Sequence, residues 1–161
     1  MSIKRRYHLR KALLRQLTRE VVDRFGEPAA ELLKGPIEVL ELEEGKEIIL
    51  AAGEALLFRL SGKIFPMLKS LNRIPLKRVV VDMGAVPHVA NGADVMAPGV
   101  VSADGEVTPG EGVAVVDERH GKPIAVGQAL VPGVEMQGPR GEVIKNLHHV
   151  GDEIWRFQAK G

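Results

Sequence analysis

The chain has 161 residues, of which 45% are apolar and 27% are charged, a composition typical of one or two small globular domains. It has no cysteine, which excludes disulfides, cysteine-ligated zinc and thiol catalysis. The net charge of +1 conceals an asymmetry, because residues 1–78 carry 16 Lys and Arg against 10 Asp and Glu, whereas residues 79–161 carry 6 against 11. The basic half favours an anionic partner such as RNA.

No apolar run approaches the length of about 20 residues that a membrane-spanning helix needs. The basic stretch MSIKRRYHLRK is not followed by the apolar core of a signal peptide. We therefore expect a cytoplasmic protein with no membrane contact. Frequent proline and scarce Asn and Gln are features of heat-adapted proteins.

Residues 8–25 are predicted to form an amphipathic helix that stops at Gly26. Its apolar residues recur every four positions in one stripe: Leu13, Leu17, Val21 and Phe25. Lys11, Arg15 and Arg19 have the same spacing and lie roughly opposite the stripe. They form either an ordinary solvated face or a ridge that contacts phosphates. The basic residues before them add to the positive charge: Lys4, Arg5, Arg6 and Arg10.

The remainder of the N-terminal half is predicted to be a small α+β unit. EPAAELLKG reads as a second short helix, and IEVLEL, EIILAA and EALLFRL read as three strands. KIFPMLKSL is predicted to form another short helix. The apolar residues of ALLFRLSGKIFPML are expected to be exposed, and in one interpretation they dock a protein partner.

From Val79 onwards, short strands with frequent glycine predict a small barrel. VVVDMGA is a predicted strand, VPHVANGA about two helical turns ended by Gly92, and ADVMAPGVVSA a strand interrupted at Pro98-Gly99. GVAVVDERHGKPIAVGQALV reads as two strands joined by a turn. Two further short strands around Gly151-Asp152 are predicted to close the chain.

The stretch NGADVMAPGV leaves the main chain with few bulky side chains around one short helix. Backbone amides exposed in this way can approach a sugar-phosphate backbone, and Gly92 is expected to adopt the left-handed conformation. Tight turns in a small barrel account for the same glycines equally well.

Residues that would support catalysis are sparse. The sequence contains no phosphate-binding loop, no dinucleotide fingerprint and no nucleophile elbow. Asp82 and Asp94 form a candidate acid pair, although stabilising a turn is the usual role of Asp beside glycine. His148 and His149 would point to opposite faces of a strand, which is poor geometry for a metal. No catalytic residue, metal or cofactor is expected.

Residues 79–152 resemble a PUA domain, the small RNA-binding pseudo-barrel of pseudouridine synthases and archaeosine transglycosylases. The matching text is VVVDMGAVPHVANGADVMAPGVV followed by GEVTPGEGVAVVDERHGKPIAVGQALV. With NLHHVGDEIWRF and the N-terminal unit, the whole chain resembles the archaeal proteins related to malignant T-cell-amplified protein and ligatin. The resemblance implies an α+β fold class, with an α+β pre-PUA domain in residues 1–75 and a PUA-type mixed β pseudo-barrel in residues 76–161.

The resemblance also implies non-catalytic RNA binding in translation, at a tRNA end or the small ribosomal subunit, during initiation, reinitiation or recycling. RNA contacts the helix-to-strand segment of PUA domains, which by position implies these residues: Gly84, Ala85, Asn91, Gly92, Ala93, Asp94, Val95, Met96, Ala97 and Pro98. Relatives of this kind work with density-regulated protein, so a translation-factor partner is implied too. Because PUA domains also occur on modification enzymes, the alternative is an enzyme or accessory subunit of tRNA or rRNA modification.

Overall fold

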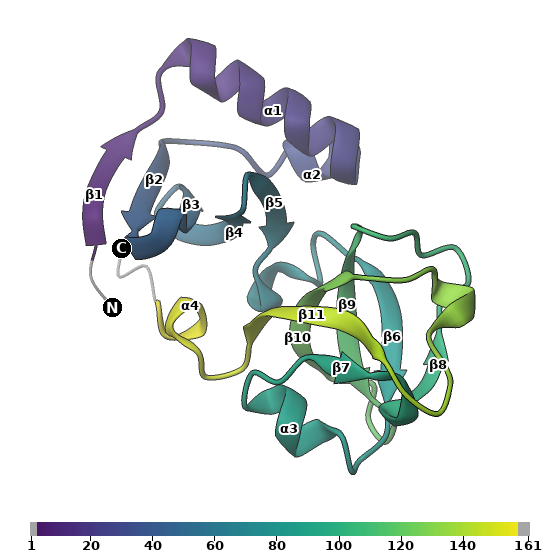
Figure 1. The fold of residues 1–161 in the computed structure, drawn as a ribbon. Helices are drawn as coiled ribbons and strands as arrows, with labels where there is room; N and C mark the ends of the chain where they lie inside the picture. Colours follow the sequence, from purple (N-terminus) through teal and green to yellow (C-terminus); the bar gives the residue numbers. More distant parts are fainter. Residues whose placement is uncertain (1–2, 158–161) are drawn as a thin grey trace. The chain divides into compact units, whose positions relative to one another are not determined.

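The computed structural model describes residues 3–157, which divide into two compact units (Figure 1). Residues 3–74 and Phe157 form the first unit, and residues 75–156 form the second. This division differs from the predicted domains 1–75 and 76–161 at Pro75 and at Phe157. Whether the two units fold as independent domains stays a prediction. No helix among residues 3–157 has the length and apolar content that crossing a membrane requires.

The first unit contains an antiparallel sheet of five strands in the order β1-β2-β3-β4-β5. The strands are β1 (Ile3–His8), β2 (Ile37–Leu42), β3 (Glu47–Ala51), β4 (Glu54–Leu60) and β5 (Lys63–Pro66). Ala52-Gly53 joins β3 to β4, and Ser61-Gly62 joins β4 to β5. All four of these turn residues have positive φ, as two-residue hairpin turns of type I′ require.

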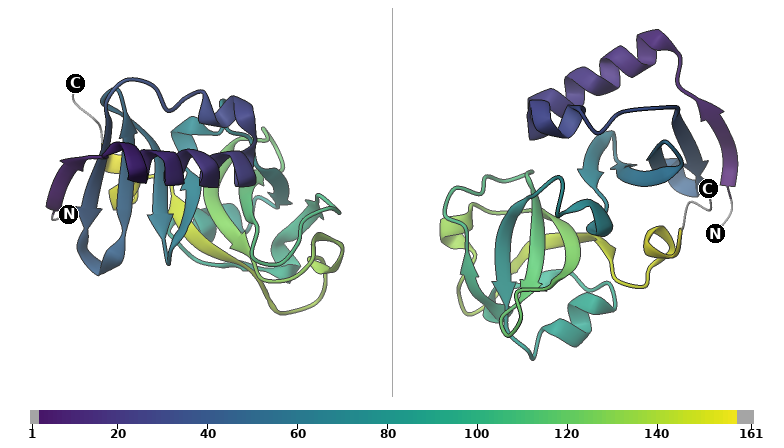
Figure 2. Two further views of the ribbon diagram at one scale, coloured as in Figure 1. Left: turned by 90° about the horizontal axis from the view of Figure 1, so that it is seen from above. Right: turned by 180° about the vertical axis from the view of Figure 1, so that it is seen from behind.

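Helix α1 (Lys11–Phe25) lies across one face of this sheet (Figure 2, left). Leu17 and Val21 are buried against core residues of the sheet. As predicted, Gly26 ends the helix, with φ 89° and its N–H bonded to the carbonyl oxygen of Val22 at 2.9 Å, and α2 (Glu27–Ala30) follows. The helix begins three residues later than predicted, because His8 belongs to β1. Leu13 of the predicted apolar stripe is 47% exposed.

The predicted helix KIFPMLKSL is wrong. Its first half is strand β5, because the Ser61-Gly62 turn folds the chain back along β4, and only a short 3-10 turn follows at Leu68–Ser70. Phe65 stacks on its cross-strand partner Phe58, with 5.5 Å between ring centroids. The expectation that ALLFRLSGKIFPML exposes its apolar residues is also wrong, since these are buried: Leu56, Leu57, Phe58, Ile64, Phe65, Met67 and Leu68.

The basic stretch at the start of the chain forms β1, a strand that the sequence analysis did not predict. Its arginines make cross-strand ion pairs with β2, from Arg5 to Glu41 at 2.8 Å and from Arg6 to Glu38 at 2.8 Å. The Arg5 guanidinium also lies 4.4 Å from the centre of the Tyr7 ring. These two charges are therefore matched within the sheet and do not strengthen a phosphate ridge on α1.

The second unit is the predicted mixed β pseudo-barrel, with strand order β7-β11-β10-β9-β6-β8. The strands are β6 (Lys77–Val81), β7 (Val95–Met96), β8 (Val100–Ala103), β9 (Gly112–Asp117), β10 (Pro123–Ala129) and β11 (Glu142–His149). β6 pairs in parallel with β9, whereas the other pairs are antiparallel. The two edge strands, β7 and β8, are separated only by the turn Ala97–Gly99, so the sheet curls until its edges nearly meet.

Two short helices complete the second unit. α3 (Val86–Ala90) packs the buried side chain of Val89 into the barrel core, as the sequence predicted for a helix before Gly92. The strand predicted at the end of the chain is wrong, because residues Glu153–Arg156 form helix α4. Asp152 starts this helix by accepting the N–H of Trp155 at 2.7 Å.

Candidate nucleic-acid interface

The residues of the predicted interface, 84–85 and 91–98, flank α3 and continue through β7 into the following turn. Among these predicted residues the exposed ones are Gly84, Asn91, Ala93, Met96 and Pro98, and the half-buried ones are Ala85, Gly92 and Asp94. The structure places Val95 and Ala97 in the barrel core. The side chains of these two residues support the segment from below and are not available to a ligand.

The start of α3 is already occupied by the protein's own carboxylates. Asp82 accepts the N–H of Ala85 at 2.8 Å through its side chain and the N–H of Val86 at 3.2 Å through its main-chain oxygen. Glu118 accepts the N–H of Met83 at 2.7 Å. These three N–H groups are therefore bonded within the protein, and the carboxylates of Asp82 and Glu118 oppose the approach of a phosphate to this end.

The end of α3 is fastened by Asn146 of β11. The side-chain amide of Asn146 donates to the carbonyl oxygens of Val89 and Ala93, both at 3.0 Å, and its main-chain N–H donates to Asp94 at 2.8 Å. Asp94 therefore accepts a main-chain N–H from β11, whereas Asp82 accepts one within its own turn. The main-chain N–H groups of residues 91–93 also bond back to α3. The segment from α3 to β7, called the ledge below, is therefore held in place, and it can present side chains and carbonyl oxygens to a ligand.

Gly92 has the left-handed conformation predicted for it, with φ 98°. A Cβ atom at this position would lie 3.0 Å from Nε2 of His149. His149 Nδ1 is 2.9 Å from the carbonyl oxygen of Val150, which can only accept, so in the neutral ring Nδ1 carries the proton and Nε2 faces Gly92 as an acceptor. Gly92 thus lets the ledge approach a histidine that the sequence analysis did not connect with it.

Lys145 and Glu142 of β11 also flank the segment, since β11 pairs with β7. Burial would raise the pKa of Asp94, but hydrogen bonds from Glu142 and from the Asn146 N–H, with the charge of Lys145, outweigh it and hold this pKa below its ordinary value. The contact with Asp94 raises the pKa of Glu142. No signal in the sequence pairs β7 with β11, so these neighbours were missed.

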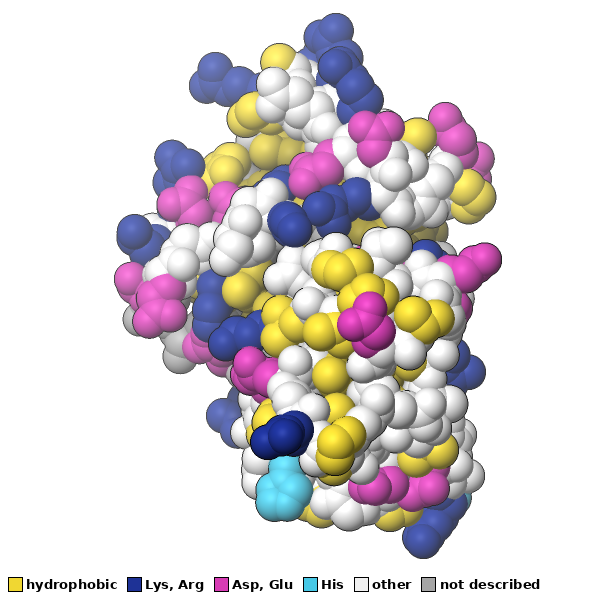
Figure 3. Space-filling model, turned by 45° about the vertical axis from the view of Figure 1, so that its right-hand side comes forward, with side chains coloured by type: hydrophobic (Ala, Val, Ile, Leu, Met, Phe, Trp, Pro, Cys, Tyr) yellow, Lys and Arg dark blue, Asp and Glu magenta, His cyan; other side chains and the backbone are white. Residues whose placement is uncertain are grey.

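The three cations of the predicted ridge lie together on the outer face of α1. Lys11, Arg15 and Arg19 are exposed and line one open groove with Leu14, Thr18, Val22 and Glu27. Within the described part of the chain none of the three forms an ion pair. Figure 3 shows several Lys and Arg side chains standing out from this unit. Unlike Arg5 and Arg6, these cations are available to an anion.

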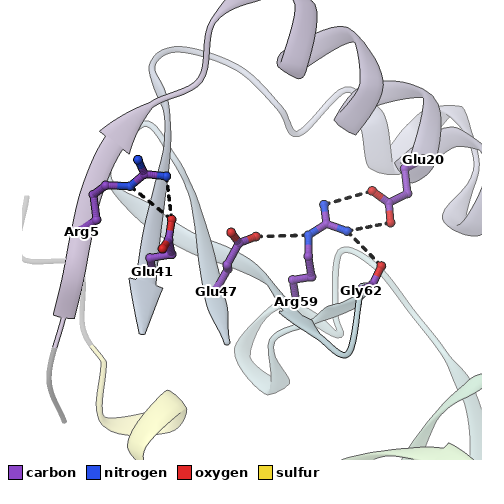
Figure 4. A network of polar contacts seen from close by, with 6 residues as sticks. All are labelled: Arg5, Glu20, Glu41, Glu47, Arg59 and Gly62. Carbon is purple, nitrogen blue, oxygen red and sulfur yellow. Dashed lines mark hydrogen bonds and ion pairs between the residues drawn. The ribbon is translucent and has the colours of Figure 1, made fainter. Parts of the chain in front are cut away.

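A network centred on Arg59 ties α1 to the sheet (Figure 4). Arg59 on β4 donates to both carboxylate oxygens of Glu20 on α1 at 3.0 Å and to Glu47 on β3 at 3.2 Å. It also donates to the carbonyl oxygen of Gly62 at 3.3 Å. Bidentate pairing of this kind fixes orientation as well as distance. The network therefore helps to set how α1 presents its cations.

Comparisons with known proteins bear on both units. Residues 77–151 match the family model of the PUA domain. An uncharacterised protein of Methanocaldococcus jannaschii is 44% identical, over 99% of this chain and 100% of the relative. Malignant T-cell-amplified sequence 1 of Danio rerio is 30% identical, over 78% and 74% of the two chains. Translation machinery-associated protein 20 of Saccharomyces cerevisiae is 29% identical, over 79% and 75%. The crystal structure of a hypothetical protein from Pyrococcus horikoshii superimposes with a TM-score of 0.79 at 37% identity, covering 94% of this chain and 98% of that one.

Proposed function

The chain belongs to the family of PUA-domain proteins that includes malignant T-cell-amplified sequence 1, and we propose that it is a non-catalytic RNA-binding protein of the translation machinery. The observation that carries this proposal is that the exposed ledge of α3 and β7 lies inside the PUA-domain match, residues 77–151. The name of the yeast relative supports a role in translation.

In this proposal the two units make different contacts with the RNA. In the second unit, Asn91 offers an amide that can donate and accept hydrogen bonds, and Met96 offers a flexible apolar side chain for a base. Neither attracts phosphate, and the carboxylates at the start of α3 repel it. Phosphate attraction comes from the first unit, through Lys11, Arg15 and Arg19.

The ligand in this proposal is a tRNA end or an RNA segment of the small ribosomal subunit, bound in the cytoplasm during initiation, reinitiation or recycling. A translation-factor protein is the proposed partner. The absence of catalysis is supported by the roles of Asp82 and Asp94, because both carboxylates are engaged with main-chain N–H groups.

Filter binding with total tRNA and with isolated small ribosomal subunits tests the proposal. We expect replacement of Lys11, Arg15 and Arg19 by Ala to weaken binding and to reduce the slope of log K against log salt by about 2 to 3, since each lost phosphate contact removes about 0.7 to 0.9. The Asn91→Ala/Met96→Ala variant should weaken binding about tenfold at every salt concentration without changing the slope.

A charge-matched control replaces Arg24, which is on α1 but does not line the groove, together with Lys34 and Lys63, which are not on α1. It gives the same change in net charge. An equal loss of slope in this control would mean that only overall charge matters. Wild-type protein that binds neither RNA would overturn the proposed function, and turnover of tRNA nucleosides by the purified chain would replace it with an RNA-modification activity.

A further inference from the structure

An exposed apolar patch lies on the pseudo-barrel and takes no part in the proposed RNA contacts. Its members are Val101 on β8, 41% exposed, with Leu130 and Val134 in the connection from β10 to β11, 42% and 77% exposed. Figure 3 shows hydrophobic side chains close together on the face it draws, with acidic and basic side chains beside them. Exposed apolar residues that gather on one face can mark an interaction site.

The protein holds this patch rigidly. The N–H of Leu130 donates to the carbonyl oxygen of Val143 at 2.9 Å, and that of Gly133 donates to Val107 at 3.0 Å. Gly133 is packed so tightly that a Cβ atom would lie 2.0 Å from the carbonyl oxygen of Asp104. Met136 is fully buried two residues after Val134 and anchors the loop in the core. Val134 is therefore presented outwards from a fixed backbone, which lowers the entropy cost of binding.

The charge around the patch is mainly negative. Residues 101–107 and 130–141 contain three carboxylates, Asp104, Glu106 and Glu135, and one cation, Arg140. All three side chains are exposed. Lys77 reaches the carbonyl oxygen of Glu106 at 3.4 Å, but its charge is matched by Glu111 at 2.8 Å. The apolar residues of the patch are thus accompanied by more carboxylates than cations.

From this complementarity we propose that the patch docks a protein segment in which apolar side chains are flanked by Lys or Arg. RNA is disfavoured because its phosphates would meet three carboxylates. A second copy of the chain is disfavoured because a two-fold contact sets the same carboxylates against each other. The inference is independent of RNA binding and provides a surface for a protein partner in place of the buried ALLFRLSGKIFPML.

Selection of a random phage-displayed peptide library on the full-length protein tests the proposal, with the Val134→Ser variant used for counter-selection. We expect the selected peptides to be enriched in Lys or Arg beside Ile, Leu or Phe and to bind Val134→Ser about tenfold more weakly than wild type. Glu135→Lys should also weaken binding and reduce its salt dependence. Leu13→Ser, a variant of an exposed apolar residue in the first unit, should bind as wild type does.

Val134→Ser should keep the wild-type melting temperature, because its side chain is exposed, and it should keep wild-type affinity for tRNA. If it melts earlier, Glu135→Lys alone decides the outcome. Peptides without basic residues, equal affinity for the variants, or no selective peptide would overturn the proposal. A dimer that Val134→Ser abolishes would assign the patch to self-association, and a loss of tRNA binding would assign it to RNA.

Discussion

Gly92 occupies the tightest point of the ledge between α3 and β7. Its φ of 98° lies where residues with a side chain are strained, and His149 fills the space that a side chain would need. The turn role of this glycine could be predicted from the residues NGA alone. Its contact with His149 could not, because that histidine comes from β11, more than fifty residues further along the chain.

We expect Gly92→Val to lower the free energy of unfolding by about 2 kcal/mol, because left-handed backbone and displacement of the His149 ring both cost energy. Urea unfolding followed by circular dichroism measures the change. The loss of stability makes this substitution unsuitable for locating the RNA, for which the exposed Asn91 and Met96 are better choices.

The double variant Gly92→Val/His149→Ala separates the two costs. In the His149→Ala background, Gly92→Val should lower the free energy of unfolding by about 1 kcal/mol less than it does in the wild type, because only the backbone strain is left. Strictly additive effects would show that His149 moves aside freely and that φ alone explains the glycine.

Among the helices and strands, the predictions that are confirmed are those in which an alternating strand pattern or a helix-ending glycine is next to a sequence typical of a turn. β2, β3, β4 and α3 belong to this group, as does α1 with Gly26. The sequence analysis missed β1 because its alternating residues are mostly basic, and its stability depends on glutamates of β2. It also missed β5 because the Ser61-Gly62 turn was overlooked beside a helix-like run.

The residues of helix α4 could form either a strand or a helix, and the side chain of Asp152 favours the helix. Trp155 and Phe157 favour a strand by propensity, but Asp152 caps a helix instead. Its carboxylate also accepts the N–H of His149 at 2.8 Å and lies 3.0 Å from Nδ1 of His148. Burial would raise the pKa of Asp152, but the hydrogen bond and charge of His148 and the two N–H donors outweigh it and lower this pKa.

This lowered pKa predicts the pH dependence of stability. A carboxyl group with a depressed pKa in the folded state stabilises the protein above its unfolded pKa, about 3.9, and loses that contribution as pH falls through the folded value. Asp152→Asn should therefore cost about 1 to 2 kcal/mol at pH 7. The difference from wild type should shrink below about pH 4. Urea unfolding between pH 3 and 7 measures it, and a difference that stays constant with pH would contradict this account.

Across the whole molecule, charge is distributed differently between the two units. Residues 3–74 carry 14 Lys and Arg against 10 Asp and Glu, and residues 75–156 carry 7 against 11. The asymmetry is visible in the sequence, but the number of available cations is not. Arg5, Arg6 and Arg59 are held by glutamates, whereas Lys11, Arg15 and Arg19 are not. Only the structure shows which cations are paired with glutamates and which can bind a phosphate.

The chain also connects its two units twice. It leaves the first unit after Ile74 and returns to it at Phe157, whose ring packs against a cluster on the sheet made of Leu40, Leu42, Ile48 and Leu50. A contact at the end of the chain therefore stabilises a sheet formed near its beginning. The sequence offered no sign of this, because Phe157 was assigned to the second domain, residues 76–161.

Phe157→Ser tests this arrangement. We expect a loss of about 1 to 2 kcal/mol, less than for a fully buried Phe because the ring is half-buried. Hydrogen exchange should show the loss at the amides of Ile48 and Leu50 and leave Val113 and Val115 of β9 unchanged, since the cluster belongs to the first unit alone. Leu130→Ser, a change to an exposed residue of the second unit, is the control and should alter neither set. Equal loss of protection in both sets would mean that the two units unfold as one cooperative body, and the division into two domains would then fail.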